Sequence, residues 1–160
     1  MGDYMYQNGF RECQAGLTRE DISAAEKRLR LQFPRSLVDH YLYCNGGTPE
    51  RQCWRRGEDW DPDCIRHFFS IRPIGVSADD EAEDDLEKVI SLVGDELPKG
   101  FIPLADDWGG NFFCIDVATG GIYYYTIDTG DDQEYNKNFL ASSLVEFIEG
   151  LIEEPDYLKA

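Results

Sequence analysis

Cationic side chains and histidine are scarce in this chain of 160 residues. Fifteen lysines and arginines stand against 32 aspartates and glutamates, giving a formal net charge of −17, and the chain has two histidines. Nucleic acids and anionic lipids attract proteins through lysine and arginine, so this balance argues against either as a partner. The charge favours instead a soluble protein that attracts basic partners.

The shortage of histidine also limits catalysis. A nucleophilic triad needs a base within reach of a serine or cysteine. His40 lies in a helical pattern, where we expect it to be partly exposed, and His67 begins a strand pattern. Neither lies in a G-x-S-x-G or cysteine-protease context. We therefore expect no catalytic residues and no enzyme activity.

Long apolar runs and closely paired cysteines are absent as well. No run approaches the length of a membrane-spanning helix, and "MGDYMYQNGFRECQAG" has no basic start followed by an apolar stretch. The odd count of five cysteines, without a C-x-x-C pair, predicts reduced thiols and a cytoplasmic location. A zinc site drawn from Cys44, Cys53, Cys64 and His67 would have suitable ligands, but its spacing matches no usual zinc motif. We expect no metal and no cofactor.

The residues that are plentiful predict a folded protein. Hydrophobic residues make up 42% of the chain and aromatic residues 13%, which favours one domain over residues 1–160. Residues 18–33 predict a helix with Thr18 as N-cap and Asp21 completing a capping box. Residues 34–47 predict a second helix, stopped by the sequence Asn45-Gly46-Gly47.

The rest of the chain predicts a sheet closed by a final helix. Residues 48–66 are polar and irregular and predict an ordered surface loop, while residues 67–75 predict a strand ending at Pro73. An acidic run precedes a helical pattern within 77–98. Residues 111–117 and 121–127 predict a hairpin inside a sheet, because both faces of each strand carry large side chains. An acidic loop over 128–139 then leads to a helix with a capping box of Ser143 and Glu146. The predicted fold class is α+β, with a central, mostly antiparallel twisted sheet flanked by N-terminal and C-terminal helices.

The stretch "ADDWGGN" carries adjacent acids and adjacent glycines. Asp106 and Asp107 would point to opposite faces of an extended strand, so adjacency alone does not make them a metal-binding pair. The glycines lead into a strand, whereas phosphate-binding loops lead into a helix. We therefore predict a structural turn in which Gly109 and Gly110 supply positive φ before Asn111.

The order of these features resembles the SUKH superfamily, in the branch of the fungal Smi/Knr cell-wall regulators and many bacterial immunity proteins. The matching stretches are "ISAAEKRLRLQFPRSLVDHYLYCNGG", "FIPLADDWGGNFFCIDVATGGIYYY" and "ASSLVEFIEGLI". The resemblance extends over 18–153. The residues that fall on the family pattern are Glu26, Pro34, Asn45, Gly46, Gly47, Pro103, Gly110, Asn111, Asp116, Ser142 and Phe147. The loop between Cys53 and Cys64, the run Asp79–Asp85 and the segment before Leu17 lie outside that pattern.

This resemblance implies a non-enzymatic protein-binding domain. Bacterial members look like antidotes that block a cognate toxin, often a nuclease or deaminase, and fungal members look like signalling scaffolds. An immunity protein that binds a basic toxin domain is the leading hypothesis. A regulatory or scaffold module without a toxin partner, and a metal-dependent hydrolase that uses the acidic loops, are the alternatives. The candidate partner-binding residues are Trp54, Trp60, Asp79, Asp80, Glu81, Glu83, Asp84, Asp85, Asp106, Asp107, Trp108, Asp131, Asp132 and Glu134.

Overall fold

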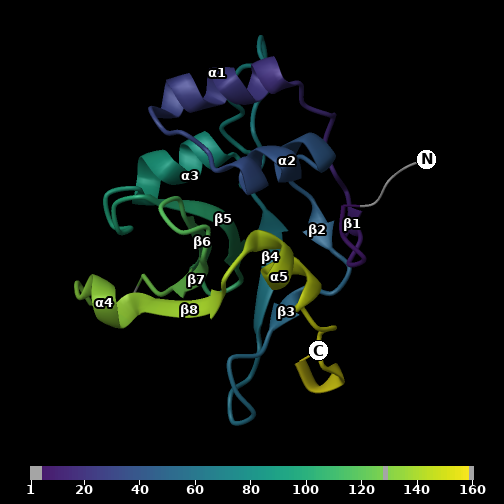
Figure 1. Cartoon of the computed structure of the whole chain (residues 1–160), viewed down its shortest axis with the longest axis vertical. Helices are drawn as coiled ribbons and strands as arrows, with labels where there is room; N and C mark the ends of the chain where they lie inside the picture. Colours follow the sequence, from purple (N-terminus) through teal and green to yellow (C-terminus); the bar gives the residue numbers. More distant parts are fainter. Residues whose placement is uncertain (1–4, 128–129, 159–160) are drawn as a thin grey trace.

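The computed structural model describes residues 5–127 and 130–158, and its centre is a curled sheet of six antiparallel strands (Figure 1). The strands pair in chain order from the first to the last. They are β3 (Cys53–Trp54), β4 (Asp63–Phe68), β5 (Phe101–Asp107), β6 (Phe112–Asp116), β7 (Ile122–Tyr125) and β8 (Lys137–Ala141). The predicted antiparallel α+β fold is confirmed.

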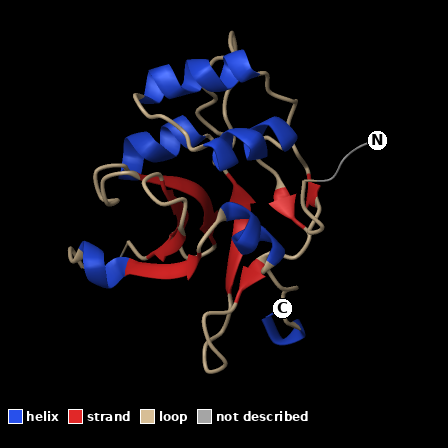
Figure 2. Cartoon of the chain, in the orientation of Figure 1, coloured by secondary structure: helices blue, strands red, loops and turns tan. Residues whose placement is uncertain are grey.

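Helices flank this sheet at both ends of the chain. The described residues form α1 (Arg19–Leu29), α2 (Arg35–Tyr43), α3 (Leu86–Val93), α4 (Gln133–Asn136), α5 (Leu144–Glu149) and a 3₁₀ turn, η1 (Asp156–Leu158). Helices α1, α2 and α3 lie together at one end of the molecule, and α5 lies against the sheet (Figure 2). A small separate ribbon of β1 (Phe10–Arg11) and β2 (Thr48–Pro49) lies beside α2.

The start of α1 follows the sequence signal closely. The Thr18 hydroxyl accepts a hydrogen bond from the Asp21 N–H at 3.1 Å, and the Asp21 carboxylate accepts one from the Thr18 N–H at 2.8 Å. The predicted capping box is therefore confirmed. Ile22 and Ala25 on the next turn are buried, so the helix packs its apolar stripe on the core.

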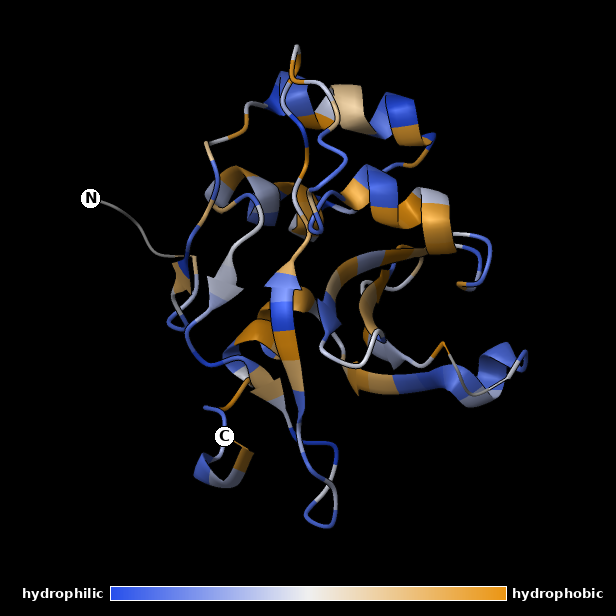
Figure 3. Cartoon of the chain, turned by 180° about the vertical axis from the view of Figure 1, so that it is seen from behind, coloured by the Kyte–Doolittle hydropathy of each residue, from blue (hydrophilic) through white to orange (hydrophobic). Residues whose placement is uncertain are grey.

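The predicted hairpin of β6 and β7 lies inside the sheet, as its two apolar faces require. Phe113 on one face packs against Phe147 of α5, with ring centroids 5.6 Å apart. Phe112 on the other face packs against Phe69, with centroids 6.0 Å apart. Strand β6 is apolar over most of its length (Figure 3). Two buried faces explain why neither strand shows the alternation of apolar and polar residues typical of a half-exposed strand.

The prediction that His40 is partly exposed is wrong. Its side chain is fully buried, and its Nδ1 lies 2.8 Å from the hydroxyl of Tyr6. Phe10 also packs on the imidazole, with ring centroids 5.2 Å apart. Burial lowers the pKa of His40 to about 3, so the ring is neutral. The sequence of α2 gives no sign of this burial, because the covering side chains come from other segments, namely Tyr6 and Phe10 before α1 and Phe68 of β4.

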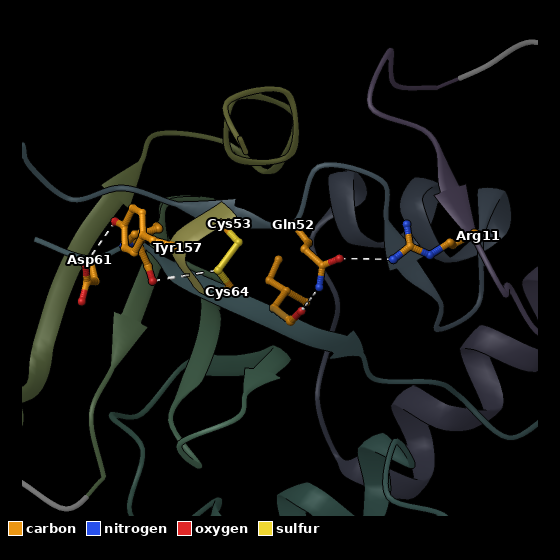
Figure 4. The surroundings of a disulfide bond; sticks show 8 residues. Arg11, Gln52, Cys53, Asp61, Cys64 and Tyr157 are labelled. Atoms are coloured by element: carbon orange, nitrogen blue, oxygen red, sulfur yellow. Dashed lines mark hydrogen bonds between the residues drawn. A yellow bond between two sulfur atoms is a disulfide. The ribbon is translucent and has the colours of Figure 1, made fainter. Parts of the chain in front are cut away.

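The prediction of reduced cysteines is wrong for four of the five. Cys13 is joined to Cys44, and Cys53 to Cys64, while Cys114 is a buried free thiol. The first bond attaches the N-terminal arm to the end of α2, and the second joins β3 to β4 (Figure 4). These bonds also use three of the ligands proposed for zinc. Neither pairing follows a local motif, so a count of cysteines could not reveal it.

Two predicted loops contain regular structure instead. Residues 48–66 hold β2, β3 and the start of β4, which ends at Phe68 and not at Pro73. The described part of 128–139 holds α4 and β8, while residues 128–129 lie outside the described residues. Strands of two residues such as β2 and β3 are too short to show a periodic pattern, and tertiary contacts decide their conformation.

Helix α2 ends slightly before the predicted stop at Asn45-Gly46-Gly47. Helix α2 ends at Tyr43, Cys44 is extended, and the left-handed residues are Gly46 at φ 74° and Gly47 at φ 78°. The buried side chain of Asn45 fixes this turn, because it donates to the Ile71 carbonyl at 2.9 Å and accepts from the Ile71 N–H at 2.8 Å. The turn thereby attaches the end of α2 to the chain that follows β4.

Candidate protein-binding surface

Three connections leave the sheet at the same end. They are the loop 55–62 between β3 and β4, the turn 108–111 between β5 and β6, and the described residues between β7 and β8, which are 126–127 and 130–136. The strand registers require this arrangement. The paired residues nearest this end are Trp54 with Asp63, Ile65 with Asp107, Asp106 with Phe112, Phe112 with Tyr125, and Tyr125 with Lys137. We call this region the loop end of the sheet.

Trp108 lies at the loop end on top of an ion-paired arginine. The Arg66 guanidinium lies 5.7 Å from the centre of the Trp108 ring and binds Asp106 through two hydrogen bonds of 2.7 and 3.2 Å. The same guanidinium reaches Glu83 at 2.8 Å. The Trp108 side chain is 77% exposed. Arg66 thus brings together three residues that the sequence analysis had selected separately.

Asp106 supports this arrangement from below the surface. The residue is only 8% exposed, and its carboxylate has Arg66 as its close partner. Hydrogen bonding to Asp106 is the main reason that the pKa of Arg66 is raised above its ordinary value. A bidentate contact of this kind fixes the plane of the guanidinium, and with it the surface on which the indole rests.

Trp60 repeats the arrangement on the hairpin of β3 and β4. The Arg56 guanidinium lies 4.9 Å from the Trp60 ring centre and 5.1 Å from that of Tyr124. It binds the Asp63 carboxylate at 2.8 Å, and burial raises the pKa of Asp63. Trp60 is 59% exposed, whereas Trp54 is half-buried against α5. Each of the two exposed tryptophans therefore rests on an arginine held by a carboxylate of β4 or β5.

Asp107 joins the two stacks through the predicted turn. One of its oxygens accepts hydrogen bonds from the N–H groups of Gly109 and Asn111, both at 2.9 Å. Its other oxygen accepts the hydroxyl of Tyr124, which also accepts from the Asn111 side chain at 3.1 Å. Burial and then Asp107 raise the pKa of Tyr124, so the phenol keeps its proton. Only Gly110, at φ 86°, has the positive φ predicted for both glycines.

The acidic run before α3 divides into exposed and structural carboxylates. Residues 79–81 are exposed, and their side chains form no ion pair within the described part of the chain. Asp84 accepts a hydrogen bond from the Gln14 side chain at 2.6 Å. Asp85 is 3% exposed, caps α3 and pairs with Arg72 at 3.0 Å. The first half of the run is thus open to a partner, while the second half stabilises the fold.

The acids after β7 divide in the same way. Asp132 caps α4 by accepting from the Glu134 N–H at 3.1 Å. Glu134 pairs with Lys137 at 3.0 Å, although its side chain is 84% exposed. Asp131 is exposed beside a cavity of about 260 Å³ that Glu96 also lines. Asp131 and Glu134 therefore add negative charge to the loop end.

Other kinds of site are not evident in residues 5–127 and 130–158. Across these ranges no cluster of three or more histidine, cysteine, aspartate or glutamate side chains has the arrangement of a metal site. None of the helices described is long and apolar enough to cross a membrane. The exposed, supported aromatic rings are the feature that distinguishes this surface, and the two arginines beneath them were not selected from the sequence.

Comparison with known proteins agrees with this architecture. The SMI1 / KNR4 family (SUKH-1) matches residues 16–150. The SPbeta prophage-derived uncharacterized protein YokK of Bacillus subtilis (strain 168) is 32% identical over 157 aligned residues, covering 86% of this chain and 76% of YokK. The family match at residues 16–150 includes the strands and turns that build the loop end of the sheet. The chain belongs to the SMI1 / KNR4 family (SUKH-1).

Proposed function

We propose that this protein binds and neutralises a basic toxin domain, such as that of a nuclease or deaminase, without an enzymatic activity of its own. The observation that carries the proposal is the pair of exposed tryptophans, each resting on an arginine that a carboxylate holds in place. Membership of the SMI1 / KNR4 family (SUKH-1) supports the same function, because the branch that this sequence resembles includes many bacterial immunity proteins.

The arrangement of the tryptophans suits tight binding. Tryptophan is enriched among the residues that dominate binding energy at protein interfaces. A side chain that is already fixed loses less conformational entropy on association. Trp60 and Trp108 are fixed by the arginines beneath them, yet most of each indole surface is exposed. We therefore place the centre of the interface at the loop end of the sheet.

Charge would guide the partner to this surface. A nuclease carries a basic cleft for phosphate, and complementary charge raises the rate of association. The net charge of −17 and the exposed acids Asp79, Asp80, Glu81 and Asp131 provide the negative field. The association rate should therefore fall steeply as salt is added, since salt screens interactions between exposed charges. A rate that salt leaves unchanged would remove the electrostatic part of the proposal.

The direct test is capture of the protein encoded by the neighbouring gene. Tagged wild-type protein should retain a basic toxin domain, and Trp60→Ala and Trp108→Ala should each weaken binding by about tenfold or more, as expected for interface anchors. Leu92→Ala is the matched control, because Leu92 is 74% exposed but lies on α3. Equal losses in all three variants, or no basic protein captured by the wild type, would contradict the proposal.

We place this activity in the cytoplasm, where a nuclease toxin meets its target. The two disulfides make that location testable, because cytosolic reductants open accessible disulfides. Thiols trapped by alkylation in living cells would give the redox state of each cysteine. Four fully oxidised cysteines in that experiment would move the proposed place of action to an oxidising compartment.

A further inference from the structure

The outer edge of β8 lines a groove. Strand β8 is the last strand of the sheet and pairs with β7 on one side only. A groove of about 580 Å³ separates it from the β3–β4 hairpin. The residues that line it are Trp54, Arg55, Arg56 and Trp60 on the hairpin side, and Lys137, Asn138, Phe139 and Leu140 on the β8 side.

The groove runs along the backbone edge of β8, and neither of the strand's two side-chain faces forms it alone. Successive side chains of a strand point to opposite faces, so a groove lined by four consecutive residues runs along the strand edge. The N–H of Thr126 donates to the carbonyl of Asn136 at 3.1 Å, so these two residues form a hydrogen-bonded pair. Hydrogen-bonded and non-hydrogen-bonded pairs alternate along an antiparallel ladder. Two residues further along, Asn138 faces β7, and Phe139 directs its N–H and C=O into the groove.

The backbone of Phe139 has no partner in that direction. Among the described residues, no hydrogen bond beyond the β7–β8 pairing engages its N–H or C=O. Its side chain is also 60% exposed. Unpaired edge strands of this kind are templates for another extended chain, and proteins usually block them with proline, bulges or a covering loop. In β8 the register shifts just after Phe139, at a bulge that includes Leu140, and the groove leaves the edge open at Phe139 itself.

The opposite wall is positively charged, unlike the molecule as a whole. Carboxylates are missing from the groove lining within the described residues. The Arg55 side chain is exposed and donates to the Trp60 carbonyl at 2.8 Å, with no carboxylate partner in the described part of the chain. The acids of the same loop, Glu58, Asp59 and Asp61, do not line the groove, whereas Arg55 does. At physiological salt the screening length is about 8 Å, so a chain bound in the groove would interact most strongly with the charges that line it.

We propose that this groove binds an extended, acidic segment of another protein, which adds to β8 as a further strand. The main chain of the segment would pair with the N–H and C=O of Phe139. A glutamate or aspartate of the segment would face Arg55 and form a charge-assisted hydrogen bond. A second copy of this chain is a poorer occupant, because each copy carries a net charge of −17. This groove shares Arg55 and Trp60 with the loop end that we assign to a basic toxin, but it selects a segment of the opposite charge.

The test is amide hydrogen exchange by NMR with a synthetic peptide. The probe is a short acetylated peptide of alternating threonine and glutamate, and its control has lysine in place of glutamate. The acidic peptide should slow exchange at the Phe139 amide and leave the Asn138 amide unchanged, since Asn138 already pairs with β7. No protection at Phe139, or equal protection by the lysine peptide, would overturn the proposal.

Reversing the charge at Arg55 tests whether the peptide binds through a specific contact or only through a weak general attraction. Arg55→Glu changes an exposed side chain and should leave the fold intact. It should lower the affinity for the acidic peptide by about tenfold or more, which is the effect of losing one charge-assisted hydrogen bond. It should also raise the affinity for the lysine peptide. Unchanged affinities would also overturn the proposal. Protection of Phe139 that needs no peptide and grows with protein concentration would assign the groove to a second copy. Because no toxin is present in these experiments, they leave the proposed toxin-binding function untouched.

Discussion

The indole of Trp108 rests on the guanidinium of Arg66, and the carboxylate of Asp106 holds that guanidinium with a contact of 2.7 Å. Only the outermost of these three side chains is largely exposed. The surface ring is thus positioned by a charge pair that belongs to the sheet. The contacts that stabilise the Arg66–Asp106 ion pair therefore also hold the Trp108 ring at the surface.

Removal of Arg66 should destabilise the protein more than loss of a surface charge would. In Arg66→Met the Asp106 carboxylate, at 8% exposure, loses both hydrogen bonds to the guanidinium and keeps only the longer contact of 3.7 Å with His67. We expect the free energy of unfolding to fall by about 2 kcal/mol. Urea denaturation measures this change. The double variant Arg66→Met, Asp106→Leu should recover much of the loss, because it removes the unpaired charge. Equal destabilisation in the single and double variants would show that packing, and not the charge, is responsible.

The buried imidazole of His40 should make stability depend on pH. Its pKa is about 3 in the folded protein and about 6.5 in an unfolded chain, so the unfolded state binds more protons between these values. The contribution of His40 is fully present above pH 6.5 and falls by about 1.4 kcal/mol for each pH unit below it, until the pH approaches 3. His40→Gln keeps an acceptor for Tyr6 but does not titrate. The difference between the two unfolding curves should therefore shrink as the pH falls, and parallel curves would contradict the prediction.

The two disulfides should open in a fixed order. Cys13 is exposed, whereas in the second bond Cys53 is fully buried and Cys64 is half-buried. Thiol–disulfide exchange needs access to a sulfur, so the Cys13–Cys44 bond should be reduced first. Timed reduction with dithiothreitol, followed by alkylation and peptide mass spectrometry, gives the order. Simultaneous loss of both bonds would indicate that opening of the first unfolds the region around the second.

Gly47 should tolerate alanine less well than another glycine of similar φ. A Cβ at Gly47, where φ is 78°, would lie 2.7 Å from the carbonyl oxygen of Arg11. Gly75 has φ 85° with no atom within 4 Å of such a Cβ. We expect Gly75→Ala to cost about 1 kcal/mol from backbone strain, and Gly47→Ala about 3 kcal/mol because a steric clash is added. Thermal unfolding compares the two, and equal midpoints would contradict the clash.

Local sequence signals predicted the parts of the fold that depend on neighbouring residues. The capping box of Thr18 and Asp21 appears as expected. The final helix shows a variant of the predicted one, because Ser143 accepts from the Glu146 N–H while the Glu146 carboxylate returns to the N–H of Ser142. Such signals work because both partners lie within one turn of helix.

Contacts between distant segments explain what the sequence did not reveal. His40 is covered by Tyr6, which lies 34 residues earlier in the chain. Arg66 meets Asp106 across 40 residues, and only the strand register brings them together. In a chain so rich in acids, the candidate surface is distinguished by Arg56 and Arg66, which lie beneath the two exposed tryptophans. No local pattern distinguishes them from the other arginines of the chain.

Tyr124 links the surroundings of Trp60 to those of Trp108. Its ring contacts Arg56 beneath Trp60, and its hydroxyl binds Asp107 at the turn that carries Trp108. We therefore expect Trp60 and Trp108 to be thermodynamically coupled through this one side chain. Substitutions at Trp60 and Trp108 should be non-additive, with a double variant whose loss of affinity differs from the sum of the single losses. In Tyr124→Phe, which lacks the hydroxyl, that interaction energy should vanish while both indoles remain in place.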